Sequence, residues 1–308
     1  CSVHSYVISN CSNYSIYCFK IFFLMKAILI NLSAWMVVPI MDALAKYLSW
    51  SLPVLQITWG RYFFTVFFTL SFILIFFRKN LVWSKNPKLQ IFRGLILLSA
   101  NILFFYSISV ISLAKALTLA FIHPLIVTAL SPLFLKEKVG IKRWFAVLIG
   151  FIGVLIVIRP GFVELNMPSL AAFGTGVCYG FYLMITRKLS NTDNPLLTLL
   201  FTGVVGAIIM TSIMPVVWVP PTLNQWYMLA CIGLVASVAH GFIIISFRMA
   251  EASKLAPLSY SEIITNIIIG YYVFSDMPDK WTFVGLFVIM LSGIYVWRRE
   301  MENLKYIK

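Results

Sequence analysis

Charged residues are scarce in this sequence. Only 11% of its 308 residues are Asp, Glu, Lys or Arg, and 61% are hydrophobic, whereas a soluble domain carries about 25% charged residues. With a mean hydropathy of +0.94, so few charges cannot provide a surface that water wets. The composition therefore predicts an integral membrane protein whose surroundings are the lipid bilayer.

Several signatures of other functions are also missing. The net charge is +14, but the basic residues lie in short gaps between apolar runs, which argues against binding of nucleic acid. The five cysteines form no CxxC pair and no Cys/His cluster with metal-ligand spacing. There is no Walker motif and no Gly-x-Ser-x-Gly elbow. We therefore expect no metal, no cofactor, no nucleotide-driven motor within the chain and no enzymatic activity.

The first 24 residues stand apart from the rest. Met25 and Lys26 open a clean apolar segment, whereas the stretch before them has no basic start, and Lys20 lies on the wrong side for a signal peptide. We expect residues 1–24 to be a non-native or disordered leader outside the fold.

Ten apolar runs follow. Most are near the ~20 residues that a helix needs to cross ~30 Å of hydrocarbon, and they are too long for barrel strands. The runs are 27–49, 54–77, 89–111, 116–135, 141–158, 168–186, 195–218, 224–247, 255–274 and 280–297. The expected fold class is all-α integral membrane, with ten transmembrane helices.

Basic residues separate the gaps into two alternating sets. The poor set holds only Lys46, Lys115, Arg159 and Lys280, and Arg61 falls inside a run. The rich set holds Lys20, Lys26, Arg78, Lys79, Lys85, Lys88, Arg93, Lys136, Lys138, Lys142, Arg143, Arg187, Lys188, Arg248, Lys254, Arg298, Arg299, Lys305 and Lys308. Because cytoplasmic loops carry the excess of Lys and Arg, we expect both termini in the cytoplasm.

The two halves of the chain correspond at an offset of about 140 residues. Lys46-Tyr47-Leu48-Ser49 aligns with Arg187-Lys188-Leu189-Ser190, and an offset of 139 aligns Ser107 with Ser246, Lys115 with Lys254, and Glu137 with Asp276. Since five is an odd number of helices, two five-helix halves must face opposite ways, which is the inverted repeat of many secondary transporters.

The motifs of both halves resemble the EamA repeat of the drug/metabolite transporter superfamily. The first half carries Pro124-Leu125, Leu135-Lys136-Glu137-Lys138, Arg143-Trp144 and Gly150-Phe151-Ile152-Gly153. The second carries Ala256-Pro257, Tyr260, Glu262, Gly270, Asp276-Met277-Pro278-Asp279, Trp281, Gly285 and Gly293. The resemblance implies EamA repeats at 25–161 (helices 1–5) and 165–300 (helices 6–10), then a cytoplasmic tail at 301–308.

This resemblance also implies a function. Proteins of this type are bacterial inner-membrane carriers of amino acids, their derivatives and other small metabolites, and the Ala-Pro-x-x-Tyr-x-Glu pattern is similar to that of rickettsial S-adenosylmethionine uptake carriers. His123 stands where that subgroup usually has a small residue, and Ser259 stands where an Arg often precedes the Tyr.

Ionisable residues inside the runs are the candidate site, because each costs at least ~2.5–3.5 kcal/mol in hydrocarbon. Glu262 and His123 are equivalent at the 139 offset, and so are His240 and Asn101. Repeat symmetry should bring all four toward the midplane, where such transporters bind their substrate. Glu262 is either a carboxylate for proton coupling or substrate binding, or a static partner of a basic group or of Tyr260.

The other three residues have alternatives of their own. His123 either relays protons and binds substrate, or bonds a carbonyl that Pro124 leaves free. For Asn101 and His240 the simpler alternative is hydrogen bonding between helices.

Helices 1 and 2 contribute further candidates. Asp42 and Lys46 are four residues apart on one helical face, which favours a structural ion pair, with a gate at the periplasmic mouth as the alternative. Arg61 could pair with Asp42 or with an anionic group of the substrate. Phe121, Tyr106, Tyr179, Tyr182 and Tyr260 are aromatic residues that could line a cavity.

The sequence thus favours a secondary carrier that works by alternating access, with a proton gradient or the substrate gradient as its driving force. A membrane-embedded enzyme and a channel are the alternatives, without a catalytic set or a filter motif to support them. The expected partners are a small-molecule substrate, the bilayer and protons, and the chain is a monomer or a homodimer.

Overall fold

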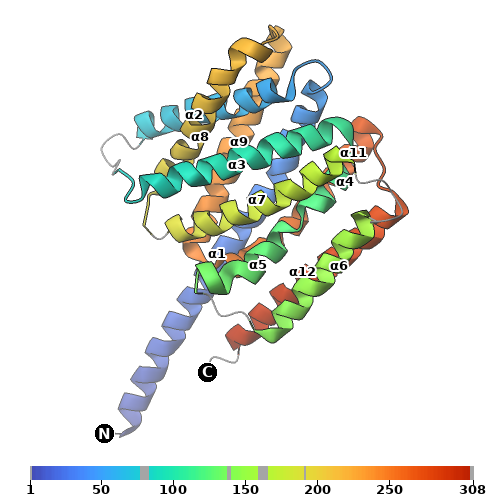
Figure 1. The fold of residues 1–308 in the computed structure, drawn as a ribbon. Helices are drawn as coiled ribbons and strands as arrows, with labels where there is room; N and C mark the ends of the chain where they lie inside the picture. Colours follow the sequence, from blue (N-terminus) through green and yellow to red (C-terminus); the bar gives the residue numbers. More distant parts are fainter. Residues whose placement is uncertain (1, 77–82, 137–139, 159–165, 191, 306–308) are drawn as a thin grey trace.

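A computed structural model describes residues 2–76, 83–136, 140–158, 166–190 and 192–305, and this part of the chain is helical with connecting loops. Each apolar run of the sequence contains helix (Figure 1). The elements are α1 (Ser2–Leu48), α2 (Val54–Phe76), α3 (Pro87–Val110), α4 (Leu113–Ala120), α5 (His123–Phe134), α6 (Ile141–Ile158), α7 (Met167–Ser190), α8 (Pro195–Val217), α9 (Leu223–Met249), α10 (Ala252–Leu255), the 3₁₀ helix η1 (Ala256–Ser261), α11 (Glu262–Phe274) and α12 (Lys280–Lys305).

Seven stretches of the described residues are long and apolar enough to cross a membrane. They lie within α1, α2, α3, the α4–α5 pair, α7, α8 and α9. Trp144–Val157 of α6 and Lys280–Ser292 of α12 are shorter apolar helices. Residues 252–274 are divided among α10, η1 and α11, so no single helix there has the length of a span. The ten-span arrangement therefore stays a prediction, although the described part of the chain is all-helical and has several helices long and apolar enough to span a membrane.

The segment expected to be a non-native or disordered leader is drawn as helix. α1 begins at Ser2 and continues into the first apolar run, so residues 2–24 are helical. In Figure 1 this part of α1 extends away from the other helices. That the leader is non-native stays a prediction.

The helices pack in a pattern that a twofold relation between the halves would produce. α1 packs along α9, and α3 packs along α7 (Figure 1). Counting α4–α5 as one run, these are helices 1 with 8 and 3 with 6, and each pair maps onto the other when five is added or subtracted. α2 with α8 and α6 with α12 are pairs that map onto themselves. The close crossing of α6 and α12 needs glycine, because a Cβ on Gly285 would lie 2.5 Å from the Gly153 carbonyl oxygen.

Two of the runs are broken in their middle. The first breaks between α4 and α5 at Phe121–Ile122, and α5 begins at His123 with Pro124 next. The second breaks through η1, and α11 begins at Glu262. His123 and Glu262 are 139 residues apart, so the offset found in the sequence also relates the first residues of the two half-helices. Broken helices leave backbone groups unpaired in the interior, which is where transporters of this architecture place their sites.

Candidate functional site

The two helix breaks meet in the interior of the bundle. Phe121 and Tyr260 occupy equivalent positions of the two repeats and pack edge to face, with ring centroids 5.3 Å apart. A residue that touches its own equivalent lies beside the symmetry axis, so this contact marks the axis. His123 Nε2 lies 3.1 Å from Ser259 Oγ across the same junction. The junction thus brings His123 against the segment that contains Ser259 and Tyr260, whereas the role of these residues in a substrate site stays a prediction.

His123 has a structural role that the sequence offered as an alternative. The carbonyl of Ala120 would ordinarily accept from the amide of residue 124, but Pro124 has no N–H. His123 Nδ1 lies 3.1 Å from that carbonyl oxygen and donates to it. The ring also stacks on Trp35 at 5.7 Å and meets Tyr179 edge to face at 5.2 Å between centroids. His123 thus closes the broken end of α4 and forms part of an aromatic wall.

Arg61, His240 and Tyr182 form a connected group whose protons can be assigned. Arg61 Nη2 lies 2.8 Å from His240 Nε2, and Tyr182 Oη lies 3.0 Å from His240 Nδ1. Because a guanidinium only donates, Nε2 must accept, and the neutral ring then donates from Nδ1 to the tyrosine oxygen. Arg61 is 2% exposed and His240 is 5% exposed. His240 therefore forms hydrogen bonds between helices, which was the simpler of its two predicted roles. One of its partners is the buried cation Arg61.

Arg93 is the functional candidate that the sequence missed. It was counted among the loop cations, but it lies within α3 and is 0% exposed. Its guanidinium donates to Thr186 Oγ1 at 2.9 Å, to the Thr198 carbonyl at 2.7 Å and to Thr202 Oγ1. Its Cζ atom lies 5.0 Å from the centroid of the Tyr182 ring. No periodicity signals this position, because a basic residue soon after Pro87 looks like part of the loop.

Two buried carboxyl groups lie in the same region without partners. Asp42 is 1% exposed, and Glu262 is 3% exposed. None of the described residues donates a hydrogen bond to Asp42 Oδ1, and none forms an ion pair with either acid. The two acids act electrostatically on each other and on the hydroxyl of Tyr179, and Arg61 also acts on Asp42 from beyond ion-pair distance. An unpaired buried carboxylate is costly, which makes these acids candidates for binding an ion or a ligand.

Asn101 and Tyr260 have different surroundings. Asn101 Nδ2 donates to Tyr62 Oη at 2.6 Å and to the Leu97 carbonyl at 2.7 Å, and Arg61 Cζ lies 4.9 Å from the Tyr62 ring centroid. Asn101 thus reaches the His240 group only through Tyr62 and Arg61. Tyr260 is buried, and its hydroxyl has no partner among the described residues.

The four polar residues paired by the repeat therefore share one region but do not touch one another. Tyr179 and Tyr182 are part of the surrounding wall, with ring centroids 5.2 Å apart. Tyr106, by contrast, is 40% exposed and lines no interior site.

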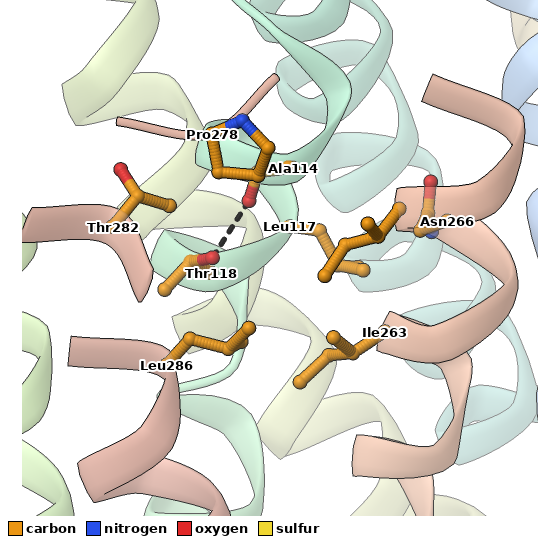
Figure 2. A pocket seen from close by; sticks show the side chains of 9 residues that line it. Ala114, Leu117, Thr118, Ile263, Asn266, Pro278, Thr282 and Leu286 are labelled. Carbon is orange, nitrogen blue, oxygen red and sulfur yellow. Dashed lines mark hydrogen bonds between the residues drawn. The ribbon is translucent and has the colours of Figure 1, made fainter. Parts of the chain in front are cut away.

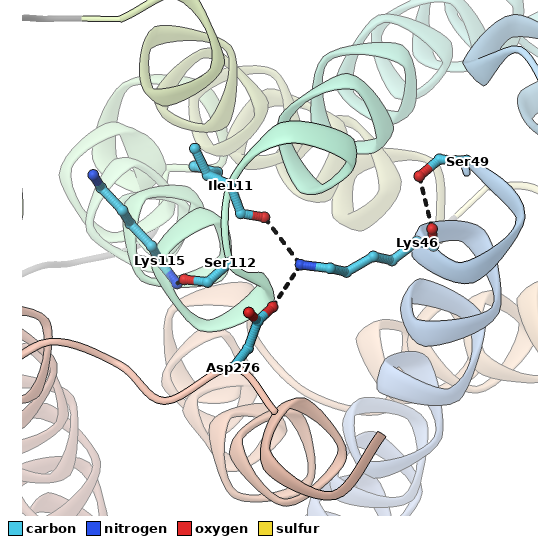
Figure 3. Close-up of polar contacts among 6 residues, drawn as sticks. All are labelled: Lys46, Ser49, Ile111, Ser112, Lys115 and Asp276. Carbon is cyan, nitrogen blue, oxygen red and sulfur yellow. Dashed lines mark hydrogen bonds and ion pairs between the residues drawn. The ribbon is translucent and has the colours of Figure 1, made fainter. Parts of the chain in front are cut away.

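The predicted ion pair between Asp42 and Lys46 is wrong. Lys46 Nζ instead lies 2.6 Å from Asp276 Oδ2 and donates to the Ile111 carbonyl at 3.2 Å (Figure 3). These contacts join the end of α1 to the α3–α4 connection and to the residues after α11. Figure 3 shows Lys115 directed away from Asp276. Lys46 therefore pairs with a residue 230 positions away in the chain rather than with Asp42, which lies four residues earlier on the same helix.

A small cavity lies beside the site, between α4, α11 and α12 (Figure 2). Leu117, Thr118, Ile263 and Asn266 are among its lining residues, and it has room for about one water molecule. Asn266 is fully buried, and neither amide atom has a hydrogen-bond partner among the described residues. Asn266 is a further residue that the sequence did not single out.

Family comparison agrees with the repeats. Residues 24–159 and 166–298 both match the model of the EamA-like transporter family. The chain belongs to the EamA-like transporter family. The match covers most of the sequence and contains both broken helices, so the residues described above lie in the two copies of the EamA domain.

Curated relatives of this EamA-like protein are named as carriers of different molecules. The S-adenosylmethionine uptake transporter of Rickettsia bellii is 26% identical over 255 residues, which are 83% of this chain and 87% of the relative. The riboflavin transporter of Vibrio cholerae is 28% identical over 195 residues, 61% of this chain and 64% of the relative. The pseudopaline exporter of Pseudomonas aeruginosa is 26% identical over 284 residues, 90% of this chain and 98% of the relative.

A solved structure shares the fold. One crystal structure aligns with 90% of this chain and 99% of its own chain at a TM-score of 0.67 and 17% identity. At that identity the likeness concerns the fold alone. Family and relatives together support a multi-pass membrane transporter of small molecules.

Proposed function

We propose that this EamA-like protein is a secondary carrier of an amino acid or amino-acid derivative, with S-adenosylmethionine as the leading candidate, and that it works by alternating access. The rickettsial relatives support the choice of substrate. The proposed setting is a bacterial inner membrane, with both termini in the cytoplasm and two inverted five-helix repeats at 25–161 and 165–300.

The observation that carries the proposal is the pair of unpartnered acids beside the helix breaks. Asp42 and Glu262 are nearly inaccessible and have no cation within 4.0 Å among the described residues. A cation from outside the chain is the natural partner, and S-adenosylmethionine brings a sulfonium and an ammonium group. In this mechanism a proton occupies Glu262 when the substrate does not, which couples transport to the proton gradient.

The aromatic residues beside these acids suit a planar group. Trp35, His123 and Tyr179 contact one another at centroid distances of 5.2 to 6.0 Å, and Tyr179 also contacts Tyr182. Aromatic rings stack on planar ligands and attract cations at their faces. An adenine ring and a sulfonium group would both find contacts here.

Alternating access requires that each end of the bundle can close. Lys46, Asp276 and the Ile111 carbonyl tie α1, the α3–α4 connection and the segment after α11 together at the predicted periplasmic end. We assign this contact, referred to below as the Lys46 latch, as the gate on that side. The gate is thus made by residues from both repeats, as rocking of one repeat against the other requires.

Uptake by proteoliposomes tests the proposal. Because proton and substrate exchange at Glu262 in this mechanism, purified protein in liposomes should accumulate labelled S-adenosylmethionine when an outward proton gradient is imposed, and a protonophore should abolish accumulation. Glu262→Gln should remove the response to the gradient, whereas Glu251→Gln on the surface should leave it intact. Passive equilibration without accumulation would indicate a channel, and chemical conversion of the substrate would indicate an enzyme. Absence of any uptake contradicts this choice of substrate.

A further inference from the structure

Arg61 holds unused hydrogen-bond donors in the interior of the protein. Nε contacts Met41 Sδ at 3.3 Å, and Nη2 uses one hydrogen on His240. The guanidinium also interacts with the Tyr62 hydroxyl, which takes up one further hydrogen. A guanidinium has five N–H donors in a planar fork that matches a carboxylate. Two or more strong donors on a side chain that is 2% exposed therefore lack an acceptor.

Tyr182 adds a third donor beside the fork. Its oxygen accepts from His240 Nδ1, as the tautomer assigned above requires, so its own hydrogen remains available. None of the described residues accepts it. Tyr182 is 0% exposed, and the guanidinium of Arg93 lies against its ring, with Cζ 5.0 Å from the centroid and Nε without a partner among the described residues. Two buried cations thus flank one tyrosine and one histidine, and no acid among the described residues forms an ion pair with either.

The free acceptors lie on a different group of side chains. Asp42 Oδ1 lacks a donor and Glu262 has no ion-pair partner among the described residues, whereas Arg61 and Tyr182 have donors that lack acceptors. Asp42, Glu262 and Arg61 all act electrostatically on the hydroxyl of Tyr179, and Arg61 also acts on Asp42, so the two groups lie within reach of each other. Buried charges that are unpaired on both sides are complementary to a ligand with a cationic and an anionic end.

We propose that the protein binds zwitterions in a fixed orientation. The substrate's carboxylate lies between the fork of Arg61 and the hydroxyl of Tyr182, and its cationic group faces Asp42 and Glu262. Arg93 touches Tyr182 rather than the substrate and acts as a positioning residue that adds positive potential behind the ring. This inference rests on the proposed function and extends it to a substrate class, the amino acids and derivatives that retain a free α-carboxylate.

Two ligands that differ in one group test the orientation. S-adenosylmethionine and its decarboxylated form share the adenosine, the sulfonium and the amine, and only the first carries a carboxylate. Competition by each against labelled S-adenosylmethionine would be measured on the purified full-length protein. Wild-type protein should bind the carboxylate form about 10- to 100-fold more tightly, as expected for hydrogen bonds to a charged group.

Single substitutions then test whether Arg61 and Tyr182 cause the preference for the ligand that carries a carboxylate. Arg61→Gln should bring the ratio of the two affinities close to one, mainly by weakening S-adenosylmethionine, and Tyr182→Phe should lower the ratio several-fold. Lys254→Gln, in a surface ion pair with Glu251, should leave it unchanged. The ratio separates recognition from folding, because a structural loss weakens both ligands alike. If Arg61→Gln fails to fold, Tyr182→Phe still tests the carboxylate contact.

The outcomes separate the two proposals. A wild-type protein that binds both ligands equally well, or an unchanged ratio in both variants, overturns the orientation and leaves the carrier function intact. An Arg61 fork that serves Asp42 instead would give this second result. A wild-type protein that binds neither ligand contradicts the proposed substrate and, with it, this inference.

Discussion

Removal of the Lys46 latch should open the predicted periplasmic end. Lys46 Nζ lies 2.6 Å from Asp276 Oδ2, and the two side chains are 10% and 30% exposed. Lys46→Met or Asp276→Asn removes the ion pair, and the lysine variant also removes the hydrogen bond to Ile111. The charge-swapped protein with Lys46→Asp and Asp276→Lys keeps an ion pair of opposite polarity.

The free-energy contribution of the ion pair follows from the distance between the two charges and from their exposure to water. Two unit charges ~3 Å apart attract by about 1.5–5 kcal/mol at effective dielectric constants of ~80 to ~20. Side-chain entropy and desolvation offset much of this, and fully exposed pairs contribute only about 0.2–1 kcal/mol. Because this pair is mostly shielded from water, we expect about 1–2 kcal/mol. The ratio of closed to open protein should then fall about 5- to 30-fold in either single variant.

Labelling of a buried cysteine measures this ratio. Ala45 is 2% exposed beside the latch, so Ala45→Cys, with the five native cysteines replaced, reports opening through its reaction with a membrane-impermeant thiol reagent. The labelling rate should rise about 5- to 30-fold in each single variant and return toward the starting rate in the charge swap. Glu251→Gln, from the surface pair, is the matched control.

Two results would refute the gate. Equal labelling rates in the presence and absence of the ion pair would show that Lys46 and Asp276 do not hold this end closed. A rate that stays high in the charge swap would assign the effect to altered packing rather than to the ion pair.

Three further predictions concern the scaffold. Gly176→Ala should destabilise the protein by about 1–3 kcal/mol, because its Cβ would lie 2.4 Å from a backbone oxygen of the α4–α5 break, whereas Gly241→Ala, with a contact at 3.7 Å, should be neutral in a thermal-stability assay. His123→Ala should cost about 1–3 kcal/mol, and Pro124→Ala in the same chain should restore stability by supplying the missing N–H; no rescue would contradict the assigned contact. Burial raises the pKa of Asp193, but hydrogen bonds from neighbouring residues outweigh it and hold the pKa below its usual value, so the stabilisation is present above the ordinary pKa of Asp and lost in acid below it; Asp193→Asn should flatten the thermal stability over that pH range.

The parts of the fold that sequence predicted depend on patterns repeated over many residues. Apolar runs of near-constant length indicated helices, and the 139-residue offset paired His123 with Glu262, although the breaks at which these two residues begin their half-helices were not predicted. Pro124 also indicated a backbone carbonyl without its usual amide donor, and the His123 ring donates a hydrogen bond to that carbonyl. These signals are local or periodic, so one sequence contains them.

The parts that failed depend on contacts between distant segments. The partner of Lys46 could not be read from its neighbours, since Asp276 comes beside it only when α1 packs against α11. Arg93 resembled a loop cation because it follows Pro87 by only six residues. Nothing in its neighbouring sequence indicates that this turn of α3 is buried. The donors of Arg61 and Tyr182 and the carboxyl groups of Asp42 and Glu262 come from helices of both repeats. Their shared location therefore also depends on packing between distant segments. The helical runs are thus visible in the sequence, whereas the pairing of buried charges is a property of the packed bundle.

Equilibrium binding of labelled S-adenosylmethionine to the purified protein tests the central claim most directly. The account predicts saturable binding by the wild type and by Glu251→Gln, with affinity at least about 10-fold weaker in Asp42→Asn and in Glu262→Gln, because each loses one carboxylate that faces the cationic group. Equal affinity in all four proteins would contradict the claim that the acids beside the broken helices form the substrate site.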